Sequence, residues 1–223
     1  MIQLDTLIQT VTVYALPVLF AITLHEAAHG YVASLFGDKT AYNLGRVSMN
    51  PTRHIDPVGT LLMPLILYFA TGGAFLFGYA KPVPVMFGKL RNPRWHGLLV
   101  TLAGPGCNFV QALLWGVLAV VLQSADVSES FFVRMASAGV LVNMVMCVFN
   151  LFPLPPLDGG RILASLLPVR QSIALSRIEP YGFFIVMALV LTGLLSRFWL
   201  SPLMDVGYTA IRLVLLPLYG ILR

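Results

Sequence analysis

The chain has 223 residues, of which 58% are hydrophobic and only 10% are charged, and its mean hydropathy is +0.85. Soluble globular domains carry about 25% charged residues, so this chain has too few to cover a soluble surface. The composition argues against a soluble enzyme, a disordered protein and a nucleic-acid binder, despite the net charge of +5. Two cysteines are too few for a disulfide framework or a multi-cysteine zinc module. We therefore predict a multi-pass membrane protein, with the lipid bilayer as its partner.

The first apolar stretch runs from about residue 7 to residue 36. It is longer than the ~20 residues that cross a bilayer. No lysine or arginine occurs before Lys39, so the stretch lacks the basic start of a secretory signal. We therefore predict that it is a retained membrane span.

This stretch contains the motif HEAAHG at residues 25–30. On a helix, His25 and His29 lie one turn apart on the same face, so both imidazoles can bind a single zinc ion. Glu26 lies next to that face and can reach a water molecule held by the metal. Ionisable groups are costly at membrane depth, which favours a functional site. The alternative is a buried polar cluster that holds neighbouring helices together.

Two unusual segments follow. The apolar stretch 58–77 is interrupted by Pro64 and by Gly72-Gly73 and has basic residues on both flanks. We predict a re-entrant element there, although its length would also allow a crossing. A short extended or β segment is predicted at Lys81-Pro82-Val83-Pro84-Val85, because the prolines remove the amide donors from one edge while the valines keep theirs. The alternative for residues 81–85 is a stiff connecting loop.

The next two spans are predicted at about 95–122 and 131–152. Asn108 lies twelve residues, or ~18 Å of helix, from His96, at the end of its span that the basic loops predict to be cytoplasmic. His25 lies at the same distance from the cytoplasmic end of the first span. We therefore expect the two side chains to reach the same level inside the bilayer, in its cytoplasmic half.

The fourth span ends in a proline-rich break that leads to Asp158. Three prolines within residues 153–156 cannot continue a helix, and irregular backbone at membrane depth needs protein or a water-filled cavity around it. A carboxylate delivered there is placed to bind a metal, and a catalytic zinc site usually has three protein ligands. Asp158 is therefore the candidate for the third ligand, although Asp158-Gly159 by itself also fits an ordinary turn.

Four further residue positions are weaker candidates for metal ligands. His54 and His96 fall in a charged loop or at a span boundary, where interfacial or solvated histidines are expected. Cys107 and Cys147 lie in apolar helices, where a buried cysteine usually acts as a small hydrophobic residue.

The distribution of charge predicts the orientation. Lysines and arginines occur in the loops 38–57, 78–94 and 154–180, whereas the connection 123–130 holds only acidic charges. The positive-inside rule then places the three basic loops in the cytoplasm, and the N-terminus and residues 123–130 outside.

We predict an all-α multi-pass membrane protein with about five transmembrane helices, plus the re-entrant element and its short extended or β segment. Residues 1–223 are expected to form a single membrane-embedded domain, with a catalytic core at about 7–165. The C-terminal helices, at about 181–222, are expected to act as scaffold or in substrate gating. We expect the protein in the plasma membrane, with its active site towards the cytoplasmic side. The sequence does not indicate an oligomeric state.

Three motifs occur in order along roughly residues 20–165. They are HEAAHG at 25–30, AGPGCN at 103–108 and NLFPLPPLDGGRIL at 150–163. With the linking segments between them, they resemble the site-2 protease family of intramembrane zinc metalloproteases. The third motif agrees at each fixed position with the family pattern NxxPxPxLDG, which opens here at Asn150. The chain resembles a compact member without the PDZ-like or nucleotide-binding regulatory domain of larger relatives.

The resemblance implies that His25, His29 and Asp158 bind one zinc ion and that Glu26 is the general base. It also makes Asn108 a residue that lines the active site, where it either packs helices together or polarises the scissile carbonyl. The implied reaction is hydrolysis of peptide bonds within or near transmembrane segments of membrane-bound proteins by zinc-activated water, as in regulated intramembrane proteolysis.

A helical substrate hides its peptide bonds and has to be bound unwound. Residues 81–85 are the candidate substrate-binding segment, because a substrate strand can pair with the edge that keeps its amides. The competing hypothesis is a metal-binding membrane protein without hydrolytic activity, such as a metal carrier or a pseudoprotease adaptor. Ligands that converge at one level, together with the presence of Glu26, favour the protease.

Overall fold

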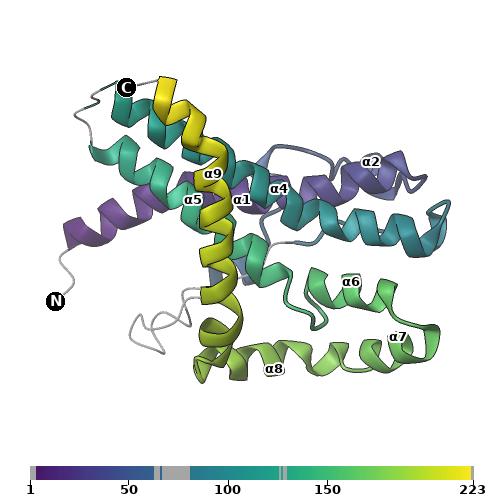
Figure 1. Ribbon diagram of the computed structural model, residues 1–223. Coiled ribbons are helices and arrows are strands. Elements are labelled where there is room, and N and C mark those ends of the chain that lie inside the picture. The colour runs from purple at the N-terminus through teal and green to yellow at the C-terminus, as the bar shows by residue number, and fades with distance from the viewer. Residues whose placement is uncertain (1–3, 63–65, 67–80, 126, 128–129, 222–223) are drawn as a thin grey trace.

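The computed structural model describes residues 4–62, 66, 81–125, 127 and 130–221 (Figure 1). These residues are mostly helical and contain no β-strand. The helices are α1 (Leu4–Leu35), α2 (Thr40–Asn43), α4 (Pro93–Ser124), α5 (Ser130–Asn150), α6 (Asp158–Leu166), α7 (Val169–Ser176), α8 (Glu179–Leu191) and α9 (Ser201–Ile221). Shorter helical turns occur at Pro51–Arg53, Pro57–Leu62, Phe87–Lys89 and Ser196–Leu200.

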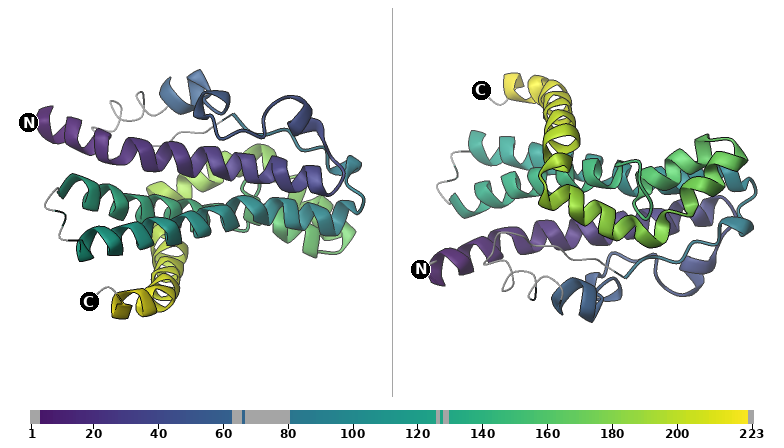
Figure 2. Two further views of the ribbon diagram at one scale, coloured as in Figure 1. Left: turned by 90° about the horizontal axis from the view of Figure 1, so that it is seen from above. Right: turned by 90° about the horizontal axis from the view of Figure 1, so that it is seen from below.

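Helices α1, α4 and α5 lie side by side and form the centre of the protein (Figures 1 and 2). Small side chains let their backbones approach closely, as is usual between membrane helices. Ala21 of α1, Ala112 of α4 and Ala136 of α5 are completely buried. Helix α4 begins with Pro93 after an Asn92 cap, whose side chain accepts a hydrogen bond from the Trp95 amide at 3.2 Å.

Helices α6, α7 and α8 run along one side of this three-helix bundle, and α9 crosses it (Figures 1 and 2). Arg94, near the start of α4, holds the far end of α6. Its guanidinium donates to the carbonyl oxygens of Ser165 at 2.8 Å and Leu166 at 3.1 Å. A positive charge at a helix C-terminus is favourable, because the last carbonyls there have no partner within the helix. Arg94 thereby fixes α6, whose first residue is Asp158.

Four helical segments of the described chain are long and apolar enough to cross a membrane. They are Ile8–Leu35, Pro93–Ser124, Ser130–Asn150 and Ser196–Gly220. A fifth is obtained if α7 and α8, which are bent by 67° relative to each other, count as one span. Helices occur at all five predicted stretches outside the re-entrant one, so the prediction of an α-helical protein with several spans is confirmed. The exact number of spans stays a prediction.

In three parts of the chain the structure either differs from the prediction or does not test it. The predicted loop 154–180 contains α6 and α7, which are too short and too polar to stand out as apolar stretches. Most of the predicted re-entrant element at 58–77 lies outside the described residues. Residues 81–85 have no regular secondary structure and no strand partner in the described part of the chain, so the predicted β segment is not confirmed.

Candidate active site and metal centre

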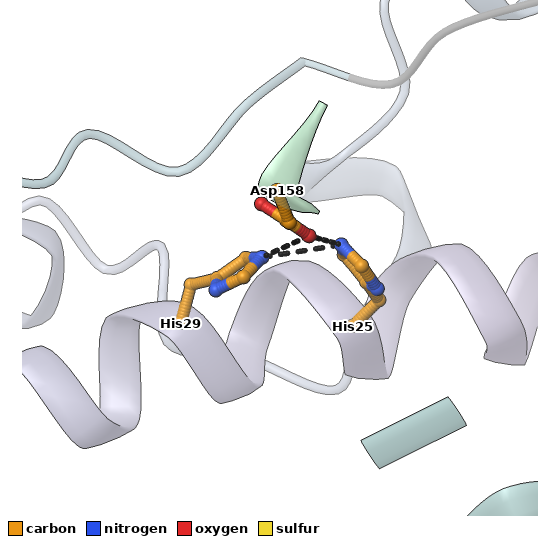
Figure 3. A group of neighbouring side chains, drawn as sticks. All are labelled: His25, His29 and Asp158. Carbon is orange, nitrogen blue, oxygen red and sulfur yellow. Dashed lines mark hydrogen bonds and ion pairs between the residues drawn. The ribbon is translucent and has the colours of Figure 1, made fainter. Parts of the chain in front are cut away.

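Helix α1 and the start of α6 bring the three predicted ligands together (Figure 3). The Nε2 atoms of His25 and His29 are 3.1 Å apart. Asp158 Oδ2 lies 3.2 Å from the first and 3.4 Å from the second. The two histidines meet because they are one turn apart on α1, and the carboxylate reaches them because α5 ends at Asn150 and the chain turns back before α6.

The second ring nitrogen of each histidine is held by another helix. His29 Nδ1 lies 2.7 Å from the backbone oxygen of Val100 on α4. A carbonyl oxygen only accepts hydrogen bonds, so this nitrogen carries the hydrogen and Nε2 keeps its lone pair. His25 Nδ1 lies 2.6 Å from Asn108 Oδ1, which confirms the prediction that these two residues reach the same level.

The arrangement fits a zinc ion. With the hydrogens on the Nδ1 atoms, both Nε2 lone pairs converge on Asp158 Oδ2, a buried oxygen that has no hydrogen-bond partner. Three buried lone pairs without a hydrogen between them repel one another unless a cation lies among them. A tetrahedral zinc ion with bonds of ~2.05 Å separates its ligands by ~3.3 Å, close to the separations of 3.1, 3.2 and 3.4 Å here. Three protein ligands also leave one position open, as in catalytic zinc sites.

Glycines allow the neighbouring backbone to lie close to this cluster. A Cβ atom at Gly104 of α4 would lie 2.6 Å from His25 Cε1 and would overlap His29 Nε2, so α4 can lie against the imidazoles only with glycine there. Gly106 is different, because a Cβ atom at this position would meet nothing within 4 Å. Gly159, next to Asp158, packs its backbone against the carbonyl oxygen of Leu151. Close packing against the cluster therefore requires glycine at position 104 and not at position 106.

Glu26 is bound by the segment predicted to contact substrate. Its Oε2 accepts a hydrogen bond from the backbone amide of Val83 at 2.7 Å. Two more hydrogen bonds hold the segment in place. The Lys81 amide donates to the His54 backbone oxygen at 3.0 Å, and the Met86 amide donates to Asp38 Oδ2 at 2.6 Å. Residues 81–86 therefore run along the outside of α1, next to Glu26.

Asp38 is the buried carboxylate that joins the end of α1 to this segment. Burial by itself would raise the pKa of Asp38. Hydrogen bonds from Thr40 and from the Met86 amide, together with the charge of Lys89, outweigh burial and hold the pKa below its ordinary value. Asp38 is thus ionised and acts as an acceptor for the loop amides.

Asn108 is completely buried between three helices. Its Nδ2 donates to the Ala21 backbone oxygen of α1 at 3.1 Å and to Asn143 Oδ1 of α5 at 3.0 Å. Both amide hydrogens are therefore used within the protein. Neither Asn143 nor the Val100 carbonyl was predicted from the sequence as part of the site. A polar side chain within an apolar span was a readable signal for Asn143, whereas nothing in a sequence marks one backbone carbonyl among many.

The other candidates lie apart from this cluster. His54 is only 2% exposed and its Nε2 donates to the Ser48 oxygen at 3.0 Å, so the expectation of an interfacial or solvated side chain was wrong. Its ring bonds the Ser48 oxygen, and its own backbone oxygen accepts from the Lys81 amide of a distant segment. His96 is half-buried and stacks on Phe36 with ring centroids 4.2 Å apart. Both cysteines are free, and neither belongs to the ligand group found among the described residues.

Comparisons with known proteins identify the family of the chain. The family model of peptidase family M50, the site-2 protease family, matches residues 120–193. The chain is 36% identical over 198 residues to YwhC of Bacillus subtilis, covering 85% of this chain and 84% of the relative. It is 31% identical over 182 residues to Rip2 of Mycolicibacterium smegmatis, covering 81% and 67%. It is 28% identical over 178 residues to MJ0392 of Methanocaldococcus jannaschii, covering 79% and 41%.

The names of these three relatives all contain the words zinc metalloprotease. No solved structure matches the chain with significant similarity. The similarity to YwhC covers most of both chains, and the apolar helices agree with a location in a membrane. The chain belongs to peptidase family M50, the site-2 protease family, and is a membrane-embedded zinc metalloprotease.

Proposed function

We propose that this protein hydrolyses peptide bonds within or near the transmembrane segments of membrane-bound proteins, as in regulated intramembrane proteolysis. The observation that carries the proposal is the convergence of Asp158 on His25 and His29, which lie beside Glu26 on α1, a helix long and apolar enough to cross a membrane. His25, His29 and Asp158 hold one zinc ion in this proposal. A bound zinc ion supplies a Lewis acid that polarises the scissile carbonyl and lowers the pKa of a coordinated water.

Glu26 is proposed to move the protons. Its carboxylate accepts a proton from the attacking water and delivers it to the departing amine. The amide of Val83 lies 2.7 Å from Glu26 Oε2 and orients this carboxylate. Because a carboxylate has two oxygens, one can accept from Val83 while the other takes the proton.

Residues 81–85 are proposed to bind the unwound substrate. The segment lies directly beside Glu26, so a substrate strand laid along it has its peptide bonds close to the base. Pro82 and Pro84 have no amide hydrogen, which leaves Val83 and Val85 as donors. Because the Val83 amide is held by Glu26, the Val85 amide is the donor proposed for a substrate carbonyl.

We also propose the following placement in the cell. Residues 1–223 form one membrane-embedded domain with a catalytic core at 7–165, and the active site opens towards the cytoplasmic side of the plasma membrane. The clustering of basic residues in 38–57, 78–94 and 154–180 supports this orientation. Labelling of single cysteines introduced into these loops, in intact and in opened cells, tests it. Labelling of the loops in intact cells would contradict the orientation.

The function is tested with Glu26→Gln and His29→Ala. Glu26→Gln is expected to retain one zinc ion per chain and to lower kcat by ~10²–10⁴, because only the base is removed. His29→Ala is expected to lose the zinc ion itself. Membrane-protein fragments are then compared between cells with the wild type and cells with Glu26→Gln. Fragments that are unchanged by Glu26→Gln would rule out this function, and zinc retained by His29→Ala would rule out the ligand assignment.

A further inference from the structure

A second buried asparagine lies behind the candidate zinc site. Asn143 is in the middle of α5, is 0% exposed and does not touch the ligand group itself. A polar side chain is costly in the interior of a membrane helix unless its hydrogen bonds are satisfied. In the described part of the chain, the Asn143 side chain bonds to the Gly139 oxygen and to Asn108, and Asn108 bonds in turn to His25.

The chain of hydrogen bonds has a defined direction. Asn143 Nδ2 lies 2.9 Å from the backbone oxygen of Gly139, one turn earlier on α5. This carbonyl only accepts, so the amino group of Asn143 must face it and Oδ1 must face Asn108. Asn108 Nδ2 then donates to that Oδ1 at 3.0 Å and to the Ala21 oxygen at 3.1 Å.

This direction decides which nitrogen of His25 carries the hydrogen. With both hydrogens of Asn108 Nδ2 engaged, Asn108 presents its Oδ1 to His25 Nδ1 at 2.6 Å. An amide oxygen accepts, so the hydrogen lies on Nδ1 and the lone pair on Nε2. Rotating the amide of Asn108 by half a turn would bring its oxygen against the Ala21 and Asn143 oxygens. The Gly139 carbonyl thus opposes that rotation through Asn143.

We infer that Asn143 is a positioning residue for the zinc site. It acts through Asn108 to keep His25 in the tautomer that presents Nε2 to the metal. This inference rests on the proposed zinc site. It also gives Asn108 a role other than polarising the scissile carbonyl, because Asn108 has no N–H left for a substrate oxygen.

The two histidines differ in how they are oriented. His29 donates to a backbone carbonyl, that of Val100, which no side-chain substitution removes. His25 depends on side chains of two other helices, α4 and α5. Zinc binding by His25 is therefore coupled to the packing of α5 against α4. Partners behind the ligands in other metal sites change metal affinity by ~10- to 100-fold when they are removed.

The test measures the zinc affinity of the full-length protein in detergent by competition with a chelator. Asn143→Leu keeps the volume of the side chain and removes its polar groups. It is expected to weaken zinc binding ~10- to 100-fold. Asn143→Ser is expected to restore part of the affinity, because a serine hydroxyl can donate to the carbonyl one turn earlier and still accept. Ser137→Ala is the matched control on α5, since Ser137 also bonds one turn back but is exposed. Its zinc affinity should stay within ~2-fold of the wild type.

A double-mutant cycle shows whether Asn143 acts through Asn108. The combination of Asn108→Leu with Asn143→Leu should weaken zinc binding no more than Asn108→Leu alone, since both remove the same effect. Additive losses would overturn the inference, as would an affinity for Asn143→Leu within 2-fold of the wild type. A zinc site that survives His25→Ala would instead overturn the proposed function.

If Asn143→Leu does not fold, the wild type provides the test. Isotope-labelled histidine reports the tautomer of each ring by nitrogen NMR of the zinc-loaded full-length chain. The hydrogen of His25 is expected on Nδ1 alone. A hydrogen on Nε2, or an even mixture of tautomers, would overturn the inference.

Discussion

Helices in both the centre and the C-terminal part of this protein are apolar enough to cross a membrane, but they are buried to different extents. In α5, 39% of the most apolar window is buried, compared with 11% in the segment that contains α9. The α1, α4 and α5 bundle buries alanines, glycines and a fully bonded pair of asparagines, whereas α9 exposes residues such as Val206 and Val214. Apolar composition thus places a helix in the membrane, while small and polar residues decide whether it joins the site.

Among the variants that test this contrast, Gly104→Ala is expected to have the largest effect on the site. Gly104→Ala puts a methyl group where the imidazoles lie, and overpacking of this kind costs ~1–3 kcal/mol. We expect zinc affinity to fall ~10- to 100-fold, measured by chelator competition. Gly106→Ala is the matched control, because the space beside Gly106 is open. Equal zinc affinities for the two variants would show that α4 does not lie against the ligands in this way.

A somewhat smaller effect is expected where the loop meets Glu26. Val83→Pro removes the amide that Glu26 accepts from, and a hydrogen bond to a charged group is worth ~1.5–3 kcal/mol. We expect kcat to fall ~10-fold or more while zinc content stays normal. Val83→Ala keeps the amide and serves as the control for the lost side chain. Val85→Pro is expected to raise KM rather than lower kcat, and an unchanged kcat and KM in both proline variants would argue against the proposed role of 81–85.

Asp38 should contribute stability that depends on pH. Its pKa is lowered in the folded protein, so its stabilising effect is full above the unfolded value of ~3.9 and is lost as pH falls through the folded value. Asp38→Asn removes this charge and is expected to lower Tm at neutral pH. The Tm difference from the wild type should shrink as pH falls below ~4. A Tm difference that stays constant from pH 3 to pH 7 contradicts an ionised Asp38 with these partners.

The smallest effect is expected at Val214 on the exposed face of α9, in contrast to the buried Ile211 on the same helix. Val214→Ala removes apolar surface that is 61% exposed, and such changes usually alter the free energy of unfolding by less than ~0.5 kcal/mol. Ile211→Ala lies on the same helix but is 5% exposed and packs with Met144 and Leu215. It is expected to destabilise by ~2–5 kcal/mol. If thermal unfolding responds equally to both variants, α9 does not pack as described.

Much of the candidate site was predictable because it depends on short-range geometry. Two histidines four residues apart meet on any helix, and Asp158 follows a proline-rich stretch that has to leave the helix. Equal distances from the span ends predicted that His25 and Asn108 would reach the same level, and their 2.6 Å contact confirms it. The helical spans followed from apolar runs that needed no knowledge of their neighbours.

Contacts between distant segments required the tertiary structure. The composition of residues 154–180 did not reveal α6, whose position depends on Arg94 and on glycine contacts with the turn before it. The sequence around His54 is typical of a loop, but the residue is 2% exposed and its backbone oxygen accepts from the distant Lys81 amide.

The sequence alone determined the helical membrane class, the family and the residues that can bind a metal. The tertiary structure decided which atoms face the candidate ligands and the candidate base. These atoms are the Val100 carbonyl at His29, the Asn143–Asn108 pair at His25 and the Val83 amide at Glu26. The reason is that helical periodicity relates residues a turn apart, whereas a hydrogen bond of about 3 Å between helices depends on how closely their backbones approach. That approach is set by packing at positions such as Gly104, which are far from the ligands in sequence.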